Sequence, residues 1–212
     1  NLIDIGIKEK YLRVAAIYGA NASGKSNLYL AMLYLQRIIA ESLNNVDDGE
    51  PTAIEQFYVP FSFEENEENS AFQIILILGD FEYKYGFEYN KKCIVTEWLY
   101  RKKLETNRTS IIFERTTDHV KFGRSVQKEW DAYKEQVPGE TLVLSFFNKL
   151  KLKNDTAKKV YAGIMETLAV PADFCEDTRV LDTLLPQVID HEKEKLTEFL
   201  SAIDTGIKDI SY

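Results

Sequence analysis

A short loop near the start of the chain carries the residue types that hold a polyphosphate. Residues 19–26 read GANASGKS and fit the pattern G-x-x-x-x-G-K-[ST] at every fixed position. Glycines let the main chain approach phosphates closely, and successive amide N–H groups then form a concavity that binds anions. The chemistry predicted for this stretch is the capture of a nucleoside triphosphate.

The residues of this loop have separate expected roles. Lys25 is expected to reach the β- and γ-phosphates, and the Ser26 hydroxyl is expected to be a ligand of Mg²⁺. The main-chain amides before Lys25 surround the phosphates, and the helix that follows adds its positive dipole end. The predicted nucleotide-binding residues here are Gly19, Ala20, Asn21, Ala22, Ser23, Gly24, Lys25, Ser26 and Asn27. A turn that matches by coincidence is the alternative.

The segments on either side of the loop argue against coincidence. Residues 12–18, LRVAAIY, are predicted to form a short buried strand. From Ser26 onward, apolar residues recur at helical spacing and predict an amphipathic helix that ends near the polar stretch 44–51. The apolar positions of this helix are Leu28, Ala31, Met32, Leu35 and Ile39. A strand before the loop and a helix after it are the context that the phosphate-loop pattern requires.

Residues 71–122 follow a different pattern, which is typical of antiparallel strands. A Gly79-Asp80 turn separates two runs, and in the second run aromatic residues alternate with polar and charged ones. The aromatic residues are Phe81, Tyr83, Tyr85, Phe87 and Tyr89. We interpret them as the core face of a β-meander of four or five strands. Stacking on nucleic-acid bases is the alternative, but no basic groove accompanies the rings.

The rest of the chain is predicted to be mainly helical. Residues 141–150, TLVLSFFNKL, read as a strand or a passage from strand to helix, and a helix capped by Asp155 or Thr156 follows. Residues 207–212 are a candidate strand. We therefore expect an α/β fold with a P-loop NTPase lobe and its antiparallel subdomain over residues 1–150. Residues 151–212 form a mainly helical segment of the same domain.

Hydrolysis of a triphosphate also requires an acidic residue at the end of an apolar strand, where it holds the Mg²⁺ water shell. The stretch IILILGDFE places Asp80 and Glu82 after an apolar run. We interpret Asp80 as part of a hairpin turn instead, because the following strand keeps the same alternation. No stretch resembles an LSGG-type signature motif either. The chain is predicted to hold a triphosphate without cleaving it.

Composition indicates which kinds of surface and which cellular location are expected for the chain. The chain has 212 residues and a net charge of −8, and this charge disfavours a general nucleic-acid or membrane surface. Its two cysteines lie far apart in sequence, which disfavours a cysteine metal site. No apolar run is long enough for a membrane helix. Because the chain has only two cysteines and no CxxC pair, a reduced, cytoplasmic location is expected. His119 and His191 are isolated and are interpreted as surface residues. Since the first residue is Asn1, the chain is expected to begin inside a longer gene product.

The stretch YGANASGKSNLYLAMLYLQRII resembles the phosphate loop of ABC-type AAA-family ATPases of the OLD and abortive-infection group of prokaryotic defence proteins. The segment PFSFEENEENSAFQIILILGDFEYKYGFEY is similar to that group's "PF-F" followed by a hairpin that ends in "Y-YGF". TEWLYRK, IIFER and KFGRS resemble its later strands, so the resemblance covers roughly residues 11–150. It implies an N-terminal ATPase lobe with an antiparallel subdomain.

The resemblance also implies partners and cofactors. Family members bind ATP and Mg²⁺ between two head domains. We therefore expect a homodimer formed through ATP, a C-terminal half that carries the missing motifs, and a possible nuclease effector. An anti-phage or abortive-infection role is implied as well. The family's glutamine loop has no glutamine at the expected place here. Asn148 is taken as its equivalent, with Ser145 and Gln56 as the other options.

Two other functions stay open at this point. A P-loop kinase or GTPase would carry a base-specificity motif such as N-K-x-D or a lid arginine pair, and neither is found. An interaction module that binds nucleotide without turnover differs little from the main interpretation, because this chain lacks recognisable hydrolysis motifs. Comparing ATP hydrolysis with and without the C-terminal half separates these possibilities.

Overall fold

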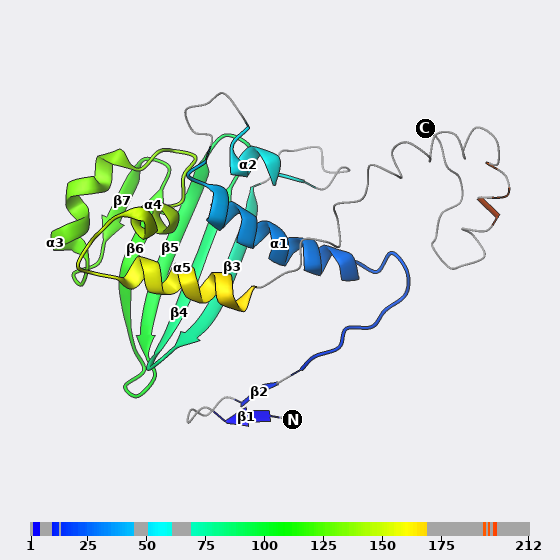
Figure 1. Cartoon of the computed structure of the whole chain (residues 1–212), viewed down its shortest axis with the longest axis horizontal. Coiled ribbons are helices and arrows are strands. Elements are labelled where there is room, and N and C mark those ends of the chain that lie inside the picture. Colours follow the sequence, from blue (N-terminus) through cyan, green and yellow to red (C-terminus); the bar gives the residue numbers. More distant parts are fainter. Residues whose placement is uncertain are drawn as a thin grey trace. The chain divides into compact units, whose positions relative to one another are not determined.

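The chain divides into two units, which are residues 1–33 with 170–212, and residues 34–169. The computed structural model describes residues 2–4, 10–12, 14–44, 51–60, 69–168, 193, 195, 197 and 198 (Figure 1). The candidate strand at 207–212, His191 and most of the predicted helical tail therefore lie outside the described residues. None of the helices in the described ranges is long and apolar enough to cross a membrane.

The first unit contains a small antiparallel pair and the phosphate-loop segment. Strand β1 (Leu2–Asp4) pairs with β2 (Lys10–Leu12), with Leu2 opposite Leu12. Residues 14–20 form no regular secondary structure and residues 21–24 form a turn, after which helix α1 (Lys25–Glu41) begins. The helix predicted after the loop is confirmed. It starts in the first unit and continues into the second.

The buried strand predicted over residues 12–18 is wrong. Its apolar side chains are open to solvent, since Val14 is 81%, Ile17 60% and Tyr18 91% exposed. An apolar run reads as a buried strand only if a neighbouring strand offers it hydrogen bonds and a covering face. Among the described strands none pairs with residues 14–20, so the local composition was a poor guide to burial.

Helix α1 buries one face in its second half only. Leu35 and Ile39, two of the predicted apolar positions, are buried, while Leu28 and Met32 near the loop are 47% and 37% exposed. The helix ends at Glu41, whose carboxylate forms an ion pair with Arg37 one turn earlier at 2.9 Å. The predicted amphipathic pattern is therefore satisfied by the second unit.

The second unit is built on an antiparallel sheet, which confirms the predicted β-meander. Its strands follow one another in sequence order, and each pairs with the next (Figure 1). They are β3 (Ser70–Leu78), β4 (Phe81–Tyr89), β5 (Ile94–Lys103), β6 (Arg108–Thr116) and β7 (His119–Phe122). Because every connection is a short hairpin, the meander forms from local pairings.

One face of this sheet carries the core, as the alternation predicted. Tyr83, Tyr85, Phe87 and Tyr89 on β4 are each at most 2% exposed. On the opposite face Gly86 accommodates Trp98 of β5, because a Cβ at Gly86 would overlap the indole ring. The aromatic residues of β4 are therefore structural, and they are covered by protein rather than open for stacking on bases.

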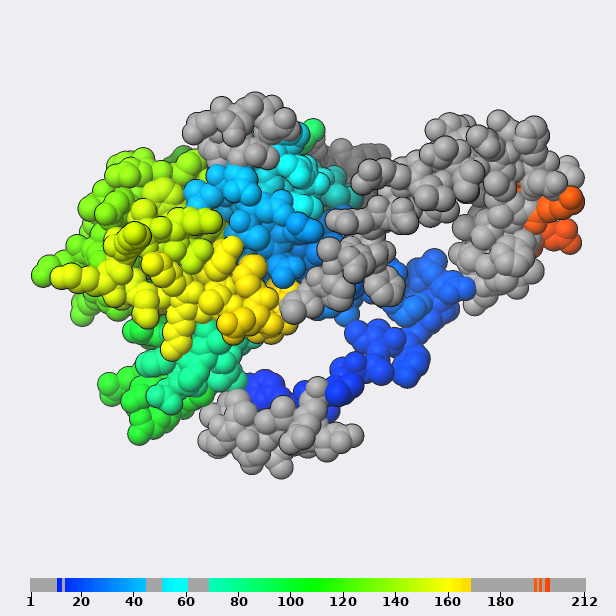
Figure 2. Space-filling model, in the orientation of Figure 1, coloured from blue at the N-terminus to red at the C-terminus, as the bar shows by residue number. Residues whose placement is uncertain are grey.

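Helices cover the core face of the sheet. Figure 1 shows α5 (Thr156–Thr167, yellow) crossing in front of the sheet, and Figure 2 shows its side chains on the surface of the molecule. Gly163 of α5 packs against Leu78 of β3. Short helices α2 (Ala53–Gln56), α3 (Gln127–Trp130) and the 3-10 helix η1 (Asp131–Gln136) lie in the connections. The indole of Trp130 stacks on the ring of Phe147 with centroids 4.1 Å apart. This contact fixes α3 against the helix that carries Phe147.

Of the two local predictions after the sheet, one is wrong and the other is confirmed. The stretch 141–150 forms helix α4 (Val143–Lys149) and contains no strand, because Val143, Leu144 and Phe147 are buried at helical spacing. Helix α5 is confirmed, but its first N–H is capped by Asn154. The side-chain oxygen of Asn154 accepts a hydrogen bond from the amide of Thr156 at 3.0 Å. Asp155 occupies the N-cap position, as predicted, although its own side chain makes no capping hydrogen bond.

Candidate functional site

The phosphate-loop motif forms a tight turn that leads directly into α1. The amide of Ser23 donates to the carbonyl oxygen of Ala20 at 3.3 Å, and the amides of Asn27 and Leu28 donate to that of Gly24. Ala22 and Gly24 have φ values of 59° and 85°, in the left-handed region. Left-handed residues within a turn are typical of main-chain nests, whose N–H groups converge on an anion. The turn thus has backbone features of an anion-binding loop.

The positive φ of Ala22 indicates that the backbone geometry of this loop is constrained by something other than the stability of the fold. Glycine adopts this conformation freely, whereas alanine does so at a cost of about 1 kcal/mol or more. Nothing buries the loop, since residues 14–27 are exposed. Strained residues in exposed loops are associated with ligand sites, where the backbone geometry serves binding.

Lys25 folds back over the loop that precedes it. Its ammonium group donates hydrogen bonds to the carbonyl oxygen of Gly19 at 2.7 Å and to that of Ala20, and contacts the Ser23 hydroxyl at 3.3 Å. These partners are neutral oxygens. A phosphate oxygen is a charged acceptor, which forms hydrogen bonds roughly twice as strong. The structure thus holds the one cation of the motif against the loop.

Gly19 is needed for this arrangement. A Cβ placed at Gly19 would lie 2.7 Å from the Ser23 hydroxyl, which is one of the three oxygens that face the ammonium group. The first glycine of the motif therefore permits the close approach of residues 19 and 23. Gly24 is needed for a different reason, its positive φ.

The remaining residues predicted for the nucleotide lie in or beside the first turn of α1. Ser26 and Asn27 follow Lys25 in the helix and are exposed, and Asn21 is exposed in the turn. The role of Ser26 as a Mg²⁺ ligand stays a prediction. Across the described ranges no group of three or more His, Cys, Asp or Glu side chains is placed to hold a metal ion.

Asp80 lies where the sequence placed it, in a hairpin turn. Gly79 has a φ of 63°, and the carbonyl oxygen of Asp80 accepts a hydrogen bond from the amide of Leu104 at 3.0 Å. Strand β3 before it lies at the edge of the antiparallel sheet. This position differs from the central parallel strand that carries a Mg²⁺-binding carboxylate, which confirms the interpretation of Asp80 as a turn residue.

The three options for a glutamine-loop equivalent have different surroundings. Asn148 is half-buried near the end of α4, and its role toward a nucleotide stays a prediction. Ser145 is buried, and its hydroxyl donates to the carbonyl oxygen of Ile39 at 2.6 Å. The Gln56 side chain donates to the carbonyl oxygen of Pro51 at 2.7 Å. Ser145 therefore ties α4 to α1, whereas the Gln56 bond stays local to α2.

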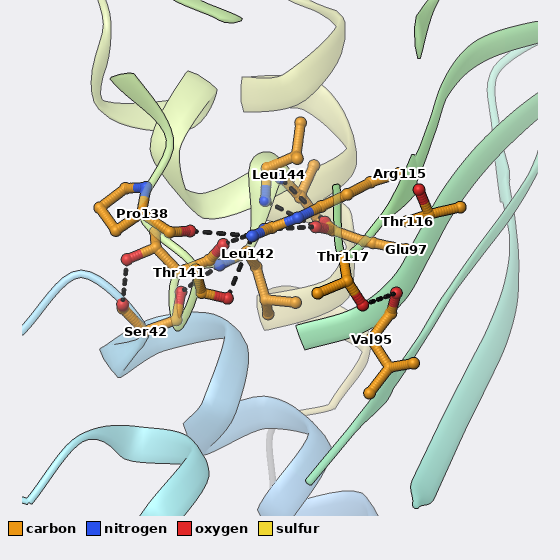
Figure 3. Close-up of polar contacts among 12 residues, drawn as sticks. Ser42, Val95, Glu97, Arg115, Thr116, Thr117, Pro138, Thr141, Leu142 and Leu144 are labelled. Carbon is orange, nitrogen blue, oxygen red and sulfur yellow. Dashed lines mark hydrogen bonds and ion pairs between the residues drawn. The ribbon is translucent and has the colours of Figure 1, made fainter. Parts of the chain in front are cut away.

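One cluster of buried charged side chains was not predicted from the sequence. Glu97 of β5 and Arg115 of β6 face each other across the sheet on its buried side, and both contact the chain around Thr141 (Figure 3). Burial raises the pKa of Glu97, while Arg115 and the amides of Leu144 and Val143 act in the opposite direction. A charge at a core-facing position on each of two neighbouring strands was the available signal.

A comparison with known protein families finds a match. Residues 14–153, which include the loop, α1, the whole sheet and α4, match the family described as "AAA domain, putative AbiEii toxin, Type IV TA system". No curated protein and no solved structure matches the chain.

Proposed function

The chain belongs to this family of AAA domains, which are P-loop NTPases, and we propose that its loop binds ATP together with Mg²⁺. The observation that carries the proposal is the Lys25 ammonium group, held by the oxygens of residues 19, 20 and 23 inside a turn with two left-handed residues. The chemistry of this loop suits a polyphosphate because amide donors, an ammonium group and a helix N-terminus lie together.

We propose that the 212-residue chain binds ATP and does not hydrolyse it alone. Support comes from Asp80, which occupies a hairpin turn, and from the resemblance to ABC-type ATPases. In that group the acidic strand and the signature motif come from a C-terminal half. The exposed apolar side chains of Val14, Ile17 and Tyr18 offer a surface for such a partner. A homodimer closed through ATP belongs to the same proposal.

The wider role that we propose is defence by abortive infection, with the ATPase controlling an effector such as a nuclease. The toxin named in the family description supports this role. A kinase of the P-loop type is disfavoured because the described sheet that follows the loop is antiparallel throughout, whereas kinases use a parallel sheet.

The test of ATP binding is Lys25→Ala, measured by titration calorimetry in the presence of Mg²⁺. We expect the variant to lose ATP affinity by at least about tenfold, because a charge-assisted hydrogen bond contributes about 1.5–3 kcal/mol. The melting temperature should change little, since Lys25 is exposed. Lys91→Ala, another exposed lysine, is the matched control and should bind as the wild type does. Equal affinity in the Lys25 variant and the wild type would show that the site is elsewhere.

A further inference from the structure

The buried pair Glu97 and Arg115 bonds mainly to the main chain of residues 138–144. The two side chains are 0% and 4% exposed, and their nearest charged atoms are 3.9 Å apart, which is long for a hydrogen bond. Burying two charges has a desolvation cost that their mutual attraction often fails to offset. Their hydrogen-bond partners therefore indicate what the pair does.

Each charge binds the same short segment. The Glu97 carboxylate accepts hydrogen bonds from the amides of Val143 at 2.7 Å and Leu144 at 3.0 Å, and from the Tyr85 hydroxyl at 3.0 Å. The Arg115 guanidinium donates to the carbonyl oxygens of residues 138 at 2.9 Å and 139 at 3.0 Å, and to that of Thr141. The pair thus fixes the path of the chain into α4 (Figure 3).

The segment that is held in this way in turn holds the end of α1. The Thr141 hydroxyl donates to the carbonyl oxygen of Ser42 at 2.9 Å, and the amide of Leu142 donates to the Ser42 hydroxyl at 3.4 Å. The Ser145 hydroxyl donates to the carbonyl oxygen of Ile39 at 2.6 Å. The last carbonyl groups of a helix have no partner within it, so these bonds satisfy groups that α1 leaves free.

We propose that these contacts form a latch that couples nucleotide capture at the start of α1 to the order of α4. The latch consists of Glu97, Arg115, Thr141, Ser145 and Ser42. Helix α1 runs without interruption from Lys25, whose ammonium group would bind phosphate, to its end beside Ser42. The inference rests on the proposed ATP binding and deepens it, because it assigns positioning residues that touch no nucleotide.

Coupling of this kind is reciprocal. If ATP binding restrains α1 and thereby α4, then loosening α4 must weaken ATP binding by the same factor. Thr141 is the best position to test this, because its hydroxyl bonds to Ser42 while its carbonyl oxygen stays available to Arg115. Thr141→Val keeps the shape and removes the hydroxyl, whereas Thr141→Ser keeps the hydroxyl and removes a methyl group.

The experiment measures ATP affinity by calorimetry and amide hydrogen exchange of residues 143–148 with and without ATP and Mg²⁺. In the wild type, ATP should slow exchange in this segment. Thr141→Val combined with Ser145→Ala should weaken ATP binding about fivefold or more and abolish that slowing. Thr141→Ser should behave as the wild type. If Thr141 had only a packing role, Thr141→Val would instead keep more of the ATP affinity than Thr141→Ser.

The outcomes separate the latch from the binding site. Unchanged exchange of residues 143–148 in a wild type that binds ATP would overturn the latch and leave the binding site intact. Wild-type affinity in the folded double variant would do the same. If the double variant does not fold, the exchange measurement on the wild type and the two Thr141 substitutions decide. Failure of the wild type to bind ATP at all would overturn the proposed function, and the coupling with it.

Discussion

At the scale of single residues, the motif predicts which atoms would bind phosphate, and the structure shows the hydrogen bonds that these atoms make within the loop. Lys25 was expected to point toward phosphates, and its ammonium group lies against the carbonyl oxygens of residues 19 and 20. Such a prediction is possible because every contact is made within seven residues of the chain. Short-range geometry follows from the residue types alone, and glycines at the close approach and the left-handed position complete it.

A prediction at this scale concerns Gly19. In Gly19→Ala the new methyl group would meet the Ser23 hydroxyl at 2.7 Å, so that hydroxyl must move away from the Lys25 ammonium group. We expect ATP affinity to fall between about two- and tenfold, the equivalent of one hydrogen bond. Lys91→Ala, at an exposed lysine outside the loop and the latch, is the control and should bind ATP as the wild type does. Titration calorimetry of both variants checks this, and equal losses would contradict the role given to Gly19.

At the scale of elements, strands and helices were predictable where their pattern repeats. The period of two in residues 81–89 predicted a strand with an aromatic core face, which β4 is. Residues 141–150 were ambiguous because a short apolar run suits a strand and a buried helix equally. Its helical form depends on partners far along the chain, including the amide of Val143 bonded to Glu97, 46 residues earlier.

The junction between α3 and α5 gives a prediction of pH dependence. The Glu129 carboxylate accepts hydrogen bonds from the amides of Lys153 at 2.6 Å and Asn154 at 2.9 Å, and these bonds lower its pKa below the ordinary glutamate value. The stabilisation is therefore complete above the ordinary glutamate pKa and is lost as the pH falls through the lowered value. Glu129→Gln should remove this part of the acid sensitivity.

Urea unfolding at neutral pH and below pH 4.5 measures the effect. The loss of stability on acidification should be smaller in Glu129→Gln than in the wild type. Glu135→Gln, at an exposed glutamate on η1, should keep the wild-type loss. The assignment fails if the two variants show the same dependence on pH.

At the scale of the whole molecule, the loop and the meander belong to different units of one chain. Helix α1 is the element that is shared, since it starts at the loop and its second half is buried in the second unit. The match to an AAA family spans both parts. This organisation suits a nucleotide-binding lobe whose occupancy is transmitted along a helix.

The chain alone should bind ATP with negligible turnover. Asp80 is the carboxylate that most nearly imitates a catalytic one, and it occupies the turn between β3 and β4. Phosphate release should therefore stay at background for the wild type and for Asp80→Asn alike. Steady Mg²⁺-dependent hydrolysis that disappears in Asp80→Asn would refute this assignment. A partner that supplies the missing acidic strand and signature motif, as we propose, should raise the rate.

The sequence by itself predicted the phosphate-loop pattern of residues 19–26 and determined the alternation of the meander, because both arise from neighbours along the chain. Tertiary structure alone decided that residues 14–20 form no strand and that Glu97 and Arg115 meet the segment before α4. The reason is physical, since burial and pairing depend on a partner distant in sequence. A strand without a neighbour stays exposed whatever its composition, and a buried charge is stabilised only by the partner that folding brings to it.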